Sequence, residues 1–261
     1  ESLLYACVES DPQPLVCFSV RDILTKKEDP SKSREMSDIA SRYYSAVFVH
    51  GDPNLIPFHV SFPETKAISK ILRYTGYISN DTIYKSSYKT NEVIVSTGGG
   101  AVGEKLLTTA ISSKPLSILS NNPWRILLGP NVSHNIHSKL TTERDESIII
   151  EPARSDFPEI LQTAKLSISQ AGYNTVVDNL KAQVQTILVP FSTRTETEQS
   201  LRAQYMQTAG LAHLLHEKDL TPQSLSDLIS KACKLRPINN HKICLDGTSR
   251  TLNYISEMLL Q

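Results

Sequence analysis

From Asn91 onward, short apolar runs alternate with longer segments that carry helical periodicity. Continuous apolar strands separated by helices are typical of a parallel sheet that is covered on both faces. The alternation therefore predicts an α/β fold of the doubly wound, Rossmann-like type. The expected strands are Glu92–Thr97, Arg125–Leu128, Ser147–Ile150, Leu166–Ser169, Thr186–Phe191 and Ala212–Leu215.

Helical patterns fill the intervals, at Val102–Ser112, His134–Thr141, Phe157–Thr163, Thr175–Ala182, Glu196–Thr208 and Pro222–Leu235. The rest of the chain predicts strands at Leu15–Ser19, Ala46–His50 and Leu72–Tyr77, and helices at Ser37–Tyr44 and Ser249–Leu260. The polar, glycine-free segment Asn80–Asn91 favours a linker. We therefore expect a partial amino-terminal lobe over residues 1–88, a Rossmann-like domain over 89–245 and a C-terminal helix over 246–261. A ligand cleft is expected beyond the carboxyl ends of the strands.

The charge of the chain is balanced. It carries 27 Lys and Arg against 27 Asp and Glu, and no segment has the basic excess that nucleic-acid or membrane-surface binding normally shows. The four cysteines form no C-x-x-C pair and no cluster with histidine at zinc-ligand spacing. No metal site is therefore expected, and a reduced, cytoplasmic protein is indicated. No run reaches the roughly 18 apolar residues of a membrane span.

The sharpest local feature is a glycine-rich run between a strand and a helix. The run Ser96-Thr97-Gly98-Gly99-Gly100-Ala101-Val102-Gly103 holds four of the ten glycines in the chain. A strand that ends in glycines and opens a helix offers free amides and the positive end of the helix dipole to a phosphate. The hydroxyls of Ser96 and Thr97 add donors. The alternative is a tight turn with no ligand.

The spacing Gly98-x-Gly100-x-x-Gly103 also matches the dinucleotide fingerprint of NAD-dependent oxidoreductases. That class requires a carboxylate about 20 residues further on to hold the ribose. No Asp or Glu occurs between Glu104 and Glu143, so the sequence disfavours an oxidoreductase.

A second strand, small-residue turn and helix follows at Leu166–Asp178, with Ser169-Gln170-Ala171-Gly172 as the turn. After it come the run Thr186–Phe191, which contains Val189-Pro190, and a helix opened by Glu198-Gln199. In this order and spacing, over roughly residues 92–215, the chain resembles the carboxyl-terminal domain of the MurG-like glycosyltransferases of family 28. The whole run resembles predicted bacterial glycosyltransferases that are distant relatives of MurG. The resemblance implies a GT-B fold with two Rossmann-like lobes, of which the first is incomplete here.

The resemblance implies a role for each turn. Gly98, Gly99 and Gly100, with Ser96 before them, match the loop near the diphosphate, and Ser169, Ala171 and Gly172 match the turn whose backbone faces the phosphates. Asp178 matches the acid that holds the ribose hydroxyls, where the family more often has Glu. Glu198 and Gln199 match the pair that contacts the donor sugar. Pro152, Ala153 and Arg154 match the loop beside the base.

Two of these acids also have a purely structural interpretation. Thr175-x-x-Asp178 and Thr195-x-x-Glu198 both match the capping box, in which the acid closes the first turn of a helix. The two interpretations are compatible, because a helix start is also where a ligand would lie.

MurG-like enzymes begin with a glycine-rich loop that carries a catalytic histidine, and this chain has no such loop. Its first residue is Glu1, so we expect that it starts inside a longer gene product or that another subunit supplies the missing half. Asp22, His50 and Asp52 stand at strand ends and are the remaining catalytic candidates, although a turn or capping role is favoured for each.

These expectations combine into an inverting glycosyltransferase in which an acceptor hydroxyl attacks the anomeric carbon. The resemblance implies that the donor is a UDP-sugar, whereas the sequence does not identify the acceptor. Loop amides and helix dipoles would stabilise the negative charge of the diphosphate without a metal ion or cofactor. The chain by itself would be an inactive fragment. The alternative from another class is a non-catalytic nucleotide-sugar-binding subunit that needs a partner. A cytoplasmic location is expected, with a peripheral position at the inner membrane left open.

Overall fold

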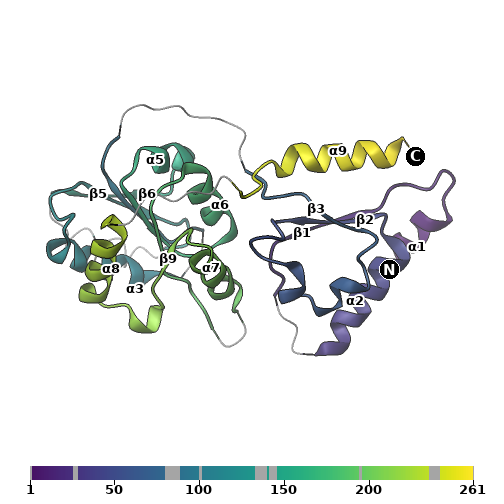
Figure 1. Ribbon diagram of the computed structural model, residues 1–261, viewed down its shortest axis with the longest axis horizontal. Helices are drawn as coiled ribbons and strands as arrows, with labels where there is room; N and C mark the ends of the chain where they lie inside the picture. Colours follow the sequence, from purple (N-terminus) through teal and green to yellow (C-terminus); the bar gives the residue numbers. More distant parts are fainter. Residues whose placement is uncertain are drawn as a thin grey trace. The chain divides into compact units, whose positions relative to one another are not determined.

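The computed structural model describes residues 2–25, 29–79, 89–99, 102–132, 140, 146–193, 196–234 and 242–260. The chain forms two compact units, one of Glu1–Asn80 with His241–Gln261 and one of Asp81–Asn240 (Figure 1). Each unit is built on a parallel sheet, so the predicted α/β class is confirmed.

The first unit contains a three-stranded sheet in the order β1-β2-β3, formed by Cys17–Arg21, Ala46–His50 and Leu72–Tyr74. Helix α1 (Ser2–Glu9) precedes the sheet, α2 (Pro30–Tyr43) connects β1 to β2, and two 3-10 turns (Phe58–Val60 and Pro63–Lys66) lie between β2 and β3. Val47 and Val49 of β2 pack with Phe58 and Phe62 in the core of this unit.

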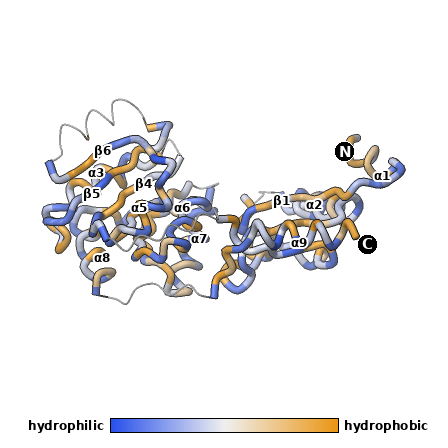
Figure 2. The backbone as a smooth tube through the Cα atoms, turned by 90° about the horizontal axis from the view of Figure 1, so that it is seen from above, coloured by the Kyte–Doolittle hydropathy of each residue, from blue (hydrophilic) through white to orange (hydrophobic). Residues whose placement is uncertain are grey.

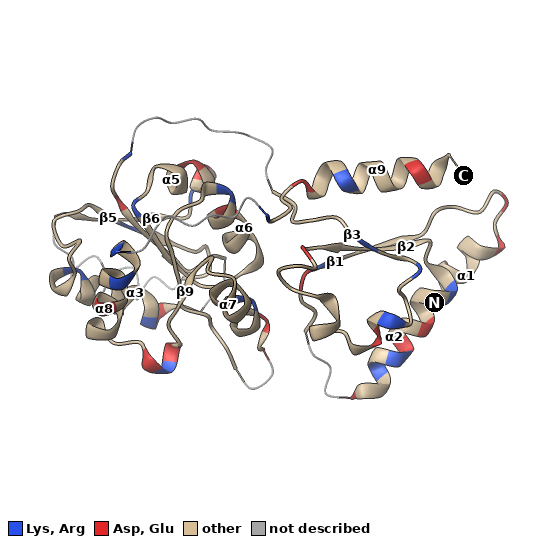
Figure 3. Cartoon of the chain, in the orientation of Figure 1, with Lys and Arg blue, Asp and Glu red and all other residues tan. Residues whose placement is uncertain are grey.

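Helix α2 begins earlier than the predicted helix at Ser37–Tyr44. Pro30 occupies its first turn, and Asp29 caps it by accepting a hydrogen bond from Ser31 N at 2.8 Å. Proline suits this position because its missing N–H would have no helical partner there. Acidic and basic side chains are mixed along α2 (Figure 3), so it presents no face of one charge.

The last helix, α9 (Gly247–Leu259), belongs to the first unit. Tyr77 N donates to Cys244 O at 2.9 Å, and Gly247 N donates to Tyr77 O at 3.0 Å. Further along α9, the ring of Tyr254 stacks on Phe48 with centroids 6.2 Å apart. Hydrophobic and hydrophilic residues alternate along this helix (Figure 2), as a helix with one packed face requires.

The second unit contains a six-stranded sheet in the order β6-β5-β4-β7-β8-β9. Its strands are β4 (Val93–Ser96), β5 (Trp124–Leu128), β6 (Ile148–Pro152), β7 (Leu166–Ser169), β8 (Thr186–Leu188) and β9 (His213–Leu214). Its helices are α3 (Glu104–Ser113), α5 (Phe157–Thr163), α6 (Tyr173–Ala182), α7 (Glu198–Thr208) and α8 (Pro222–Lys234), with 3-10 turns at Lys114–Leu116 and Glu217–Asp219. All six predicted strands are therefore confirmed, whereas the predicted helix His134–Thr141 lies outside the described residues except for Leu140.

Residues of β4 alternate between two hydrophobic cores. Val93 packs in the core that holds Leu107 of α3 and Ile229 of α8, whereas Ile94 packs with Leu161 of α5. Successive side chains of a strand point to opposite faces, so a strand that is apolar throughout needs helices on both sides. This arrangement explains why continuous apolar runs predicted a doubly covered sheet.

The strand order reverses between β4 and β7. From β4 the chain proceeds outward to β5 and β6, and from β7 it proceeds in the other direction to β8 and β9. In open parallel sheets, ligands bind at the carboxyl ends of the strands where the order reverses. The ends of β4 and β7 are neighbours there, with Ser96 opposite Ser169.

Candidate functional site

Two strand-to-helix turns lie side by side at this reversal. The first turn leads from β4 through Gly98 and Gly99 to α3, and the second leads from β7 through Ala171 and Gly172 to α6. The N-cap residues are Gly103 and Gly172, and neither helix has a side-chain cap. Uncapped amides at the positive end of a helix dipole suit an anionic ligand.

The first turn depends on glycine at two positions. Gly98 and Gly103 have φ of +64° and +137°, which other residues rarely adopt. A Cβ at Gly103 would also lie 2.4 Å from Thr97 Cγ2. Asn131 donates from Nδ2 to the carbonyl oxygen of Gly99 at 2.6 Å and so braces the middle of the turn.

Two hydroxyl groups at the end of β4 are buried without a partner. Ser96 is 5% exposed and Thr97 is 2% exposed, and neither side-chain oxygen has a hydrogen bond among the described residues. A buried polar group left unsatisfied costs about 1–3 kcal/mol. A phosphate bound in the turn would satisfy such donors. Gly100, which the resemblance places beside them, lies outside the described residues.

Gln170 joins the two turns, and the sequence did not single it out. Its Nε2 donates to Val102 O at 3.2 Å, and its backbone N–H donates to Ser96 O at 3.3 Å. The sequence feature that could have identified Gln170 is its position as a polar residue directly after a buried strand. Ser169 is buried, and its hydroxyl lies 3.5 Å from Asn179 Nδ2. The Ser169 hydroxyl is therefore already engaged by a side chain of α6.

Asp178 lies in the second turn of α6, because this helix begins at Tyr173. The capping-box alternative for Thr175 and Asp178 is therefore wrong. The Asp178 carboxylate has no hydrogen bond or ion pair within the described part of the chain. Burial raises the pKa of Asp178 to about 6, and the positive charge of Lys181 opposes this only in part. A half-buried carboxylate without a partner is a candidate ligand group.

Helix α7 begins at Glu198, directly after its N-cap residue Thr197. The capping-box alternative for Glu198 is therefore also wrong. The oxygen Oε1 of Gln199 accepts hydrogen bonds from Ala171 N at 3.1 Å and from Phe191 N at 3.2 Å. Two hydrogen bonds thus connect the start of α7 to the second turn and to the segment after β8, and Glu198 and Gln199 lie next to Ala171.

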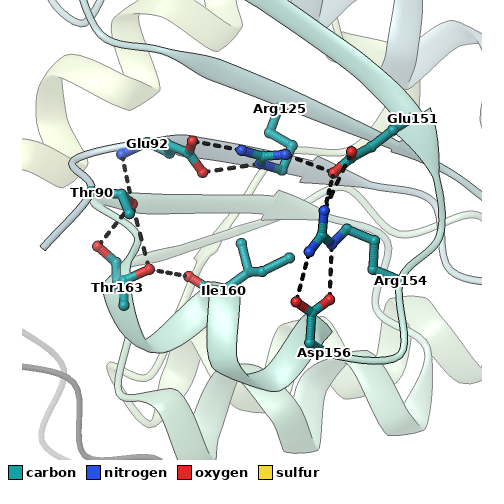
Figure 4. Close-up of polar contacts among 8 residues, drawn as sticks. All are labelled: Thr90, Glu92, Arg125, Glu151, Arg154, Asp156, Ile160 and Thr163. Carbon is teal, nitrogen blue, oxygen red and sulfur yellow. Dashed lines mark hydrogen bonds and ion pairs between the residues drawn. The ribbon is translucent and has the colours of Figure 1, made fainter. Parts of the chain in front are cut away.

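Arg154 lies in an ion-pair network on β4, β5, β6 and the start of α5 (Figure 4). Its Nη2 and Nε donate to the Asp156 carboxylate at 2.7 and 2.8 Å, and its Nη1 lies 3.4 Å from Glu151 Oε1. Arg125 binds the same Glu151 oxygen at 2.7 Å and Glu92 at 2.8 Å. The Arg154 guanidinium therefore already has two carboxylate partners, and it would have to exchange one of them to reach a base.

Asp22 and Asp52 hold the backbone and side chains of the first unit. Asp52 accepts hydrogen bonds from Asn54 N and Cys244 N, both at 2.9 Å. Asp22 is fully buried, and its Oδ2 accepts from the Tyr77 hydroxyl at 3.4 Å. This geometry favours the turn interpretation for both residues.

His50 takes part in a chain of side-chain hydrogen bonds. Its Nδ1 lies 2.8 Å from Thr75 Oγ1, which donates to Gly76 O at 2.8 Å, and its Nε2 lies 2.5 Å from Ser19 Oγ. A hydroxyl has one proton, so Thr75 accepts from Nδ1–H, and Nε2 accepts from Ser19. Burial lowers the pKa of His50, which favours this neutral form.

Two kinds of feature are not found in the described residues. Their His, Cys, Asp and Glu side chains form no group of three or more that could hold a metal ion. None of their helices is long and apolar enough to span a membrane.

The sequence matches the family described as "Glycosyltransferase family 28 C-terminal domain" over residues 93–242. This match covers more than half of the chain and includes both turns. The chain belongs to this family. The resemblance predicted from the two turns is therefore confirmed.

Two relatives of this family 28 chain carry the same name. The UDP-N-acetylglucosamine--N-acetylmuramyl-(pentapeptide) pyrophosphoryl-undecaprenol N-acetylglucosamine transferase of Clostridium kluyveri is 27% identical over 164 residues, which are 61% of this chain and 45% of that protein. The transferase of the same name from Gloeothece citriformis is 35% identical over 89 residues, which are 33% of this chain and 25% of that protein. The family 28 chain thus spans less than half the length of these curated relatives.

Solved glycosyltransferase structures share the fold. MurG of Acinetobacter baumannii matches with a TM-score of 0.53 and 17% identity, over 87% of this chain and 79% of that chain. The spinosyn rhamnosyltransferase SpnG matches with a TM-score of 0.56 and 12% identity, over 100% of this chain and 75% of that chain. The family 28 chain therefore has the α/β fold of the GT-B glycosyltransferases, as the sequence predicted.

Proposed function

We propose that the chain binds a UDP-sugar where the ends of β4 and β7 meet, and that the whole protein transfers the sugar to an acceptor hydroxyl with inversion and without a metal ion. The observation that supports this most is the pair of uncapped strand-to-helix turns at the reversal of strand order. The names of the relatives support UDP as the nucleotide.

The two turns supply the groups that a diphosphate needs. Backbone amides at Gly98, Gly99 and Gly172 and the hydroxyls of Ser96 and Thr97 are the proposed donors. The N-termini of α3 and α6 add two positive dipole ends. Donors that are fixed before the reaction stabilise the charge that develops on the leaving diphosphate, which is the role a metal ion has in other transferases.

Three side chains are proposed to bind the ribose and the sugar. The carboxylate of Asp178, which has no partner among the described residues, can accept hydrogen bonds from both ribose hydroxyls. Glu198 can accept from a sugar hydroxyl through Oε2, which has no partner in the described part of the chain. Gln199 can contribute only its Nε2 donor, because Oε1 already accepts two backbone hydrogen bonds.

In the proposed reaction, a base removes the proton of the acceptor hydroxyl, whose oxygen attacks the anomeric carbon as the nucleoside diphosphate leaves. Among the three catalytic candidates, His50 has the most suitable chemistry, because burial lowers its pKa and so favours the neutral ring, and its Nε2 lies 2.5 Å from the Ser19 hydroxyl. A cytoplasmic location, with a peripheral position at the inner membrane, belongs to the same proposal.

The oxidoreductase alternative loses support at the end of β5. The strand ends at Leu128 and is followed by Gly129-Pro130-Asn131, with no carboxylate to hold an NAD ribose. The Asn131 side chain is already hydrogen-bonded to Gly99 O.

Calorimetry of the chain with UDP, UDP-N-acetylglucosamine, GDP and NAD, each in EDTA and in Mg²⁺, tests the proposal. The expected result is binding of the uridine nucleotides alone, unchanged by EDTA. Absence of binding by every nucleoside diphosphate to the folded chain would refute it.

A matched pair of variants localises the site. Gly98 and Gly210 have φ of +64° and +70°, and neither has a close neighbour that a Cβ would strike. Aspartate tolerates this backbone conformation better than most residues. Gly98→Asp places a negative charge in the first turn and should abolish UDP binding. Gly210→Asp places the same charge after α7 and should leave binding unchanged.

A further inference from the structure

Arg202, in the second turn of α7, is a fully buried cation. Its Nη1 donates to Ala171 O at 2.8 Å, and its Nη2 lies 2.5 Å from Glu198 Oε1. Its Cζ atom lies 5.8 Å from the centroid of the Tyr173 ring. One guanidinium therefore joins the second turn, the first residue of α6 and the first residue of α7.

Packing alone does not require a charge at this position. The neighbouring buried residues of α7 are Ala203 and Met206. A buried ion pair is on average no more stabilising than apolar residues of similar volume, since both charges must be desolvated. The planar guanidinium does offer what an apolar side chain lacks, because it holds two acceptors in a fixed relative geometry.

Two side chains of α7 bind the backbone N–H and the carbonyl oxygen of Ala171. Gln199 accepts its N–H and Arg202 donates to its carbonyl oxygen. The same arginine holds Oε1 of Glu198, whose side chain is 22% exposed. Among the described residues, Oε2 of Glu198 has no hydrogen-bond partner, so the carboxylate is fixed through one oxygen and open through the other.

We infer that Arg202 is a positioning residue for donor-sugar recognition. It fixes the Glu198 carboxylate relative to the phosphate-facing turn, so that Oε2 meets one hydroxyl of the sugar once the diphosphate is seated. Arg202 does not touch the donor. The inference rests on the proposed function of the β4/β7 site and deepens it, because it assigns the sugar contact to a single oxygen and its orientation to Arg202.

The test separates sugar recognition from nucleotide binding. Calorimetry gives the affinities for UDP and for UDP-N-acetylglucosamine, and their ratio measures what the sugar contributes. The proteins are the unchanged chain, Glu198→Gln, Arg202→Met, Arg202→Lys and the double variant Glu198→Gln/Arg202→Met. Thermal melting of each protein shows whether it is folded.

We expect Glu198→Gln and Arg202→Met each to reduce the ratio by about tenfold, since each weakens one charge-assisted hydrogen bond to the sugar. The double variant should lose no more than either single variant, because both changes remove the same contact. Arg202→Lys should restore part of the ratio, since an ammonium can hold Glu198 but not both acceptors. If Arg202→Met does not fold, Arg202→Lys and Glu198→Gln provide the same comparison.

The outcomes that overturn the inference differ from those that overturn the proposed function. An unchanged chain that binds neither UDP nor UDP-N-acetylglucosamine refutes the proposed function itself. An unchanged chain that binds both, with Arg202 variants that lower the two affinities equally, refutes the positioning role alone. Additive losses in the double variant refute it as well, because they show that Arg202 and Glu198 act independently.

Discussion

Gln170 donates from Nε2 to the carbonyl oxygen of Val102 at 3.2 Å, and this bond ties the second turn to the residue that precedes Gly103 and α3. Gln170→Leu leaves that carbonyl without its partner. We expect it to lower the free energy of unfolding by about 1–3 kcal/mol and to weaken UDP binding by about two- to tenfold. Melting curves and calorimetry measure the two effects.

Gln185→Leu is the matched control for this variant. Gln185 also donates from Nε2 to a backbone carbonyl, that of Ala232 at 3.0 Å, but it lies before β8, near the amino ends of the strands. It should lower stability by a similar amount and leave UDP affinity unchanged. Equal effects of both variants on affinity would mean that the bond from Gln170 has no special role at the site.

The fold was largely predictable, because its strands are buried on both faces. The strand Leu166–Ser169 and the helix Phe157–Thr163 have the bounds that the hydrophobic pattern predicted. Helix α1 was missed, since all of its residues lie outside the core and its unbroken apolar run shows no helical alternation with polar residues. Helix α2 was predicted to start late because the apolar periodicity appears only in its second half, although Asp29-Pro30 signalled its start.

The candidate site was predictable only in part. Each turn was visible as a local pattern of a strand, small residues and a helix. The bonds that assemble the turns join residues far apart in the chain, 68 positions between Gln170 and Val102 and 31 between Arg202 and Ala171. The first contact follows from the adjacency of β4 and β7, and the second from that of β7 and β8, which α7 follows. No local pattern reveals either adjacency. The capping-box interpretations were wrong because the helices begin at Tyr173 and Glu198, so neither acid occupies the third helical position that a capping box requires.

Glycine should be required at one end of the first turn and replaceable in the middle. Gly103→Ala forces a Cβ to within 2.4 Å of Thr97 Cγ2 at a φ of +137°. We expect it to lower the free energy of unfolding by about 1–3 kcal/mol and to disturb nucleotide binding. At Gly99 a Cβ meets nothing within 4 Å, so Gly99→Ala should leave the melting temperature unchanged. Equal melting temperatures for the two variants would contradict this geometry.

The ion-pair network around Arg125 separates structural from ligand roles. The side chains of Arg125 and Glu92 are 17% and 11% exposed, whereas that of Arg154 is 41% exposed. Arg125→Met leaves Glu92 without its partner and Glu151 with Arg154 alone, and it should lower the free energy of unfolding by about 3 kcal/mol or more. Arg154→Ala should change it far less, because an ion pair between exposed side chains contributes little to stability.

The same Arg154→Ala variant tests whether this residue contacts the nucleotide base, beside which the family resemblance places its loop. If Arg154 keeps Glu151 and Asp156 as its partners when nucleotide binds, UDP affinity stays as it is. A loss of about tenfold or more would show that the guanidinium exchanges a partner to reach the nucleotide, as the family resemblance implies.

His50 should be neutral and protonated on Nδ1. Burial lowers its pKa below the ordinary value of 6.5, so the folded state disfavours the charged ring. Stability from this residue is therefore present above about pH 6.5 and is lost as the pH falls below that value. Nitrogen-15 NMR of the ring measures both the tautomer and the pKa. Thr75→Val removes the acceptor of Nδ1–H and should increase the population of the Nε2–H tautomer; an unchanged tautomer would contradict the hydrogen-bond chain.

Asp178 links the stability of the second unit to its proposed ligand. Burial raises its pKa to about 6, from an ordinary value of 3.8. The folded state therefore holds this proton more tightly than the unfolded state does. As the pH rises from about 4 to about 6, the unfolded state loses this proton first, so the free energy of unfolding falls. The loss is complete above about pH 6. A ribose whose hydroxyls donate to the carboxylate would stabilise the ionised form and so reduce this loss of stability.

Asp178→Asn should therefore stabilise the free protein and weaken its binding. The rise in melting temperature should be small at pH 4 and larger at pH 7, because the substituted carboxylate is charged only at the higher pH.

UDP affinity at pH 7 should fall by about 10–150-fold with the loss of charge-assisted hydrogen bonds. Replacing UDP by 2′-deoxy-UDP should reduce affinity less in the variant than in the unchanged chain. In the unchanged chain, affinity for UDP-N-acetylglucosamine should decline as the pH falls below 6, whereas in the variant it should be flat, because the esterified diphosphate, unlike the terminal phosphate of UDP with its pKa of about 6, does not titrate in this range. Calorimetry and melting curves at pH 4, 5, 6 and 7 provide every value. A stabilised variant that binds UDP within about twofold of the unchanged chain would show that Asp178 is a strained carboxylate with no part in ribose recognition.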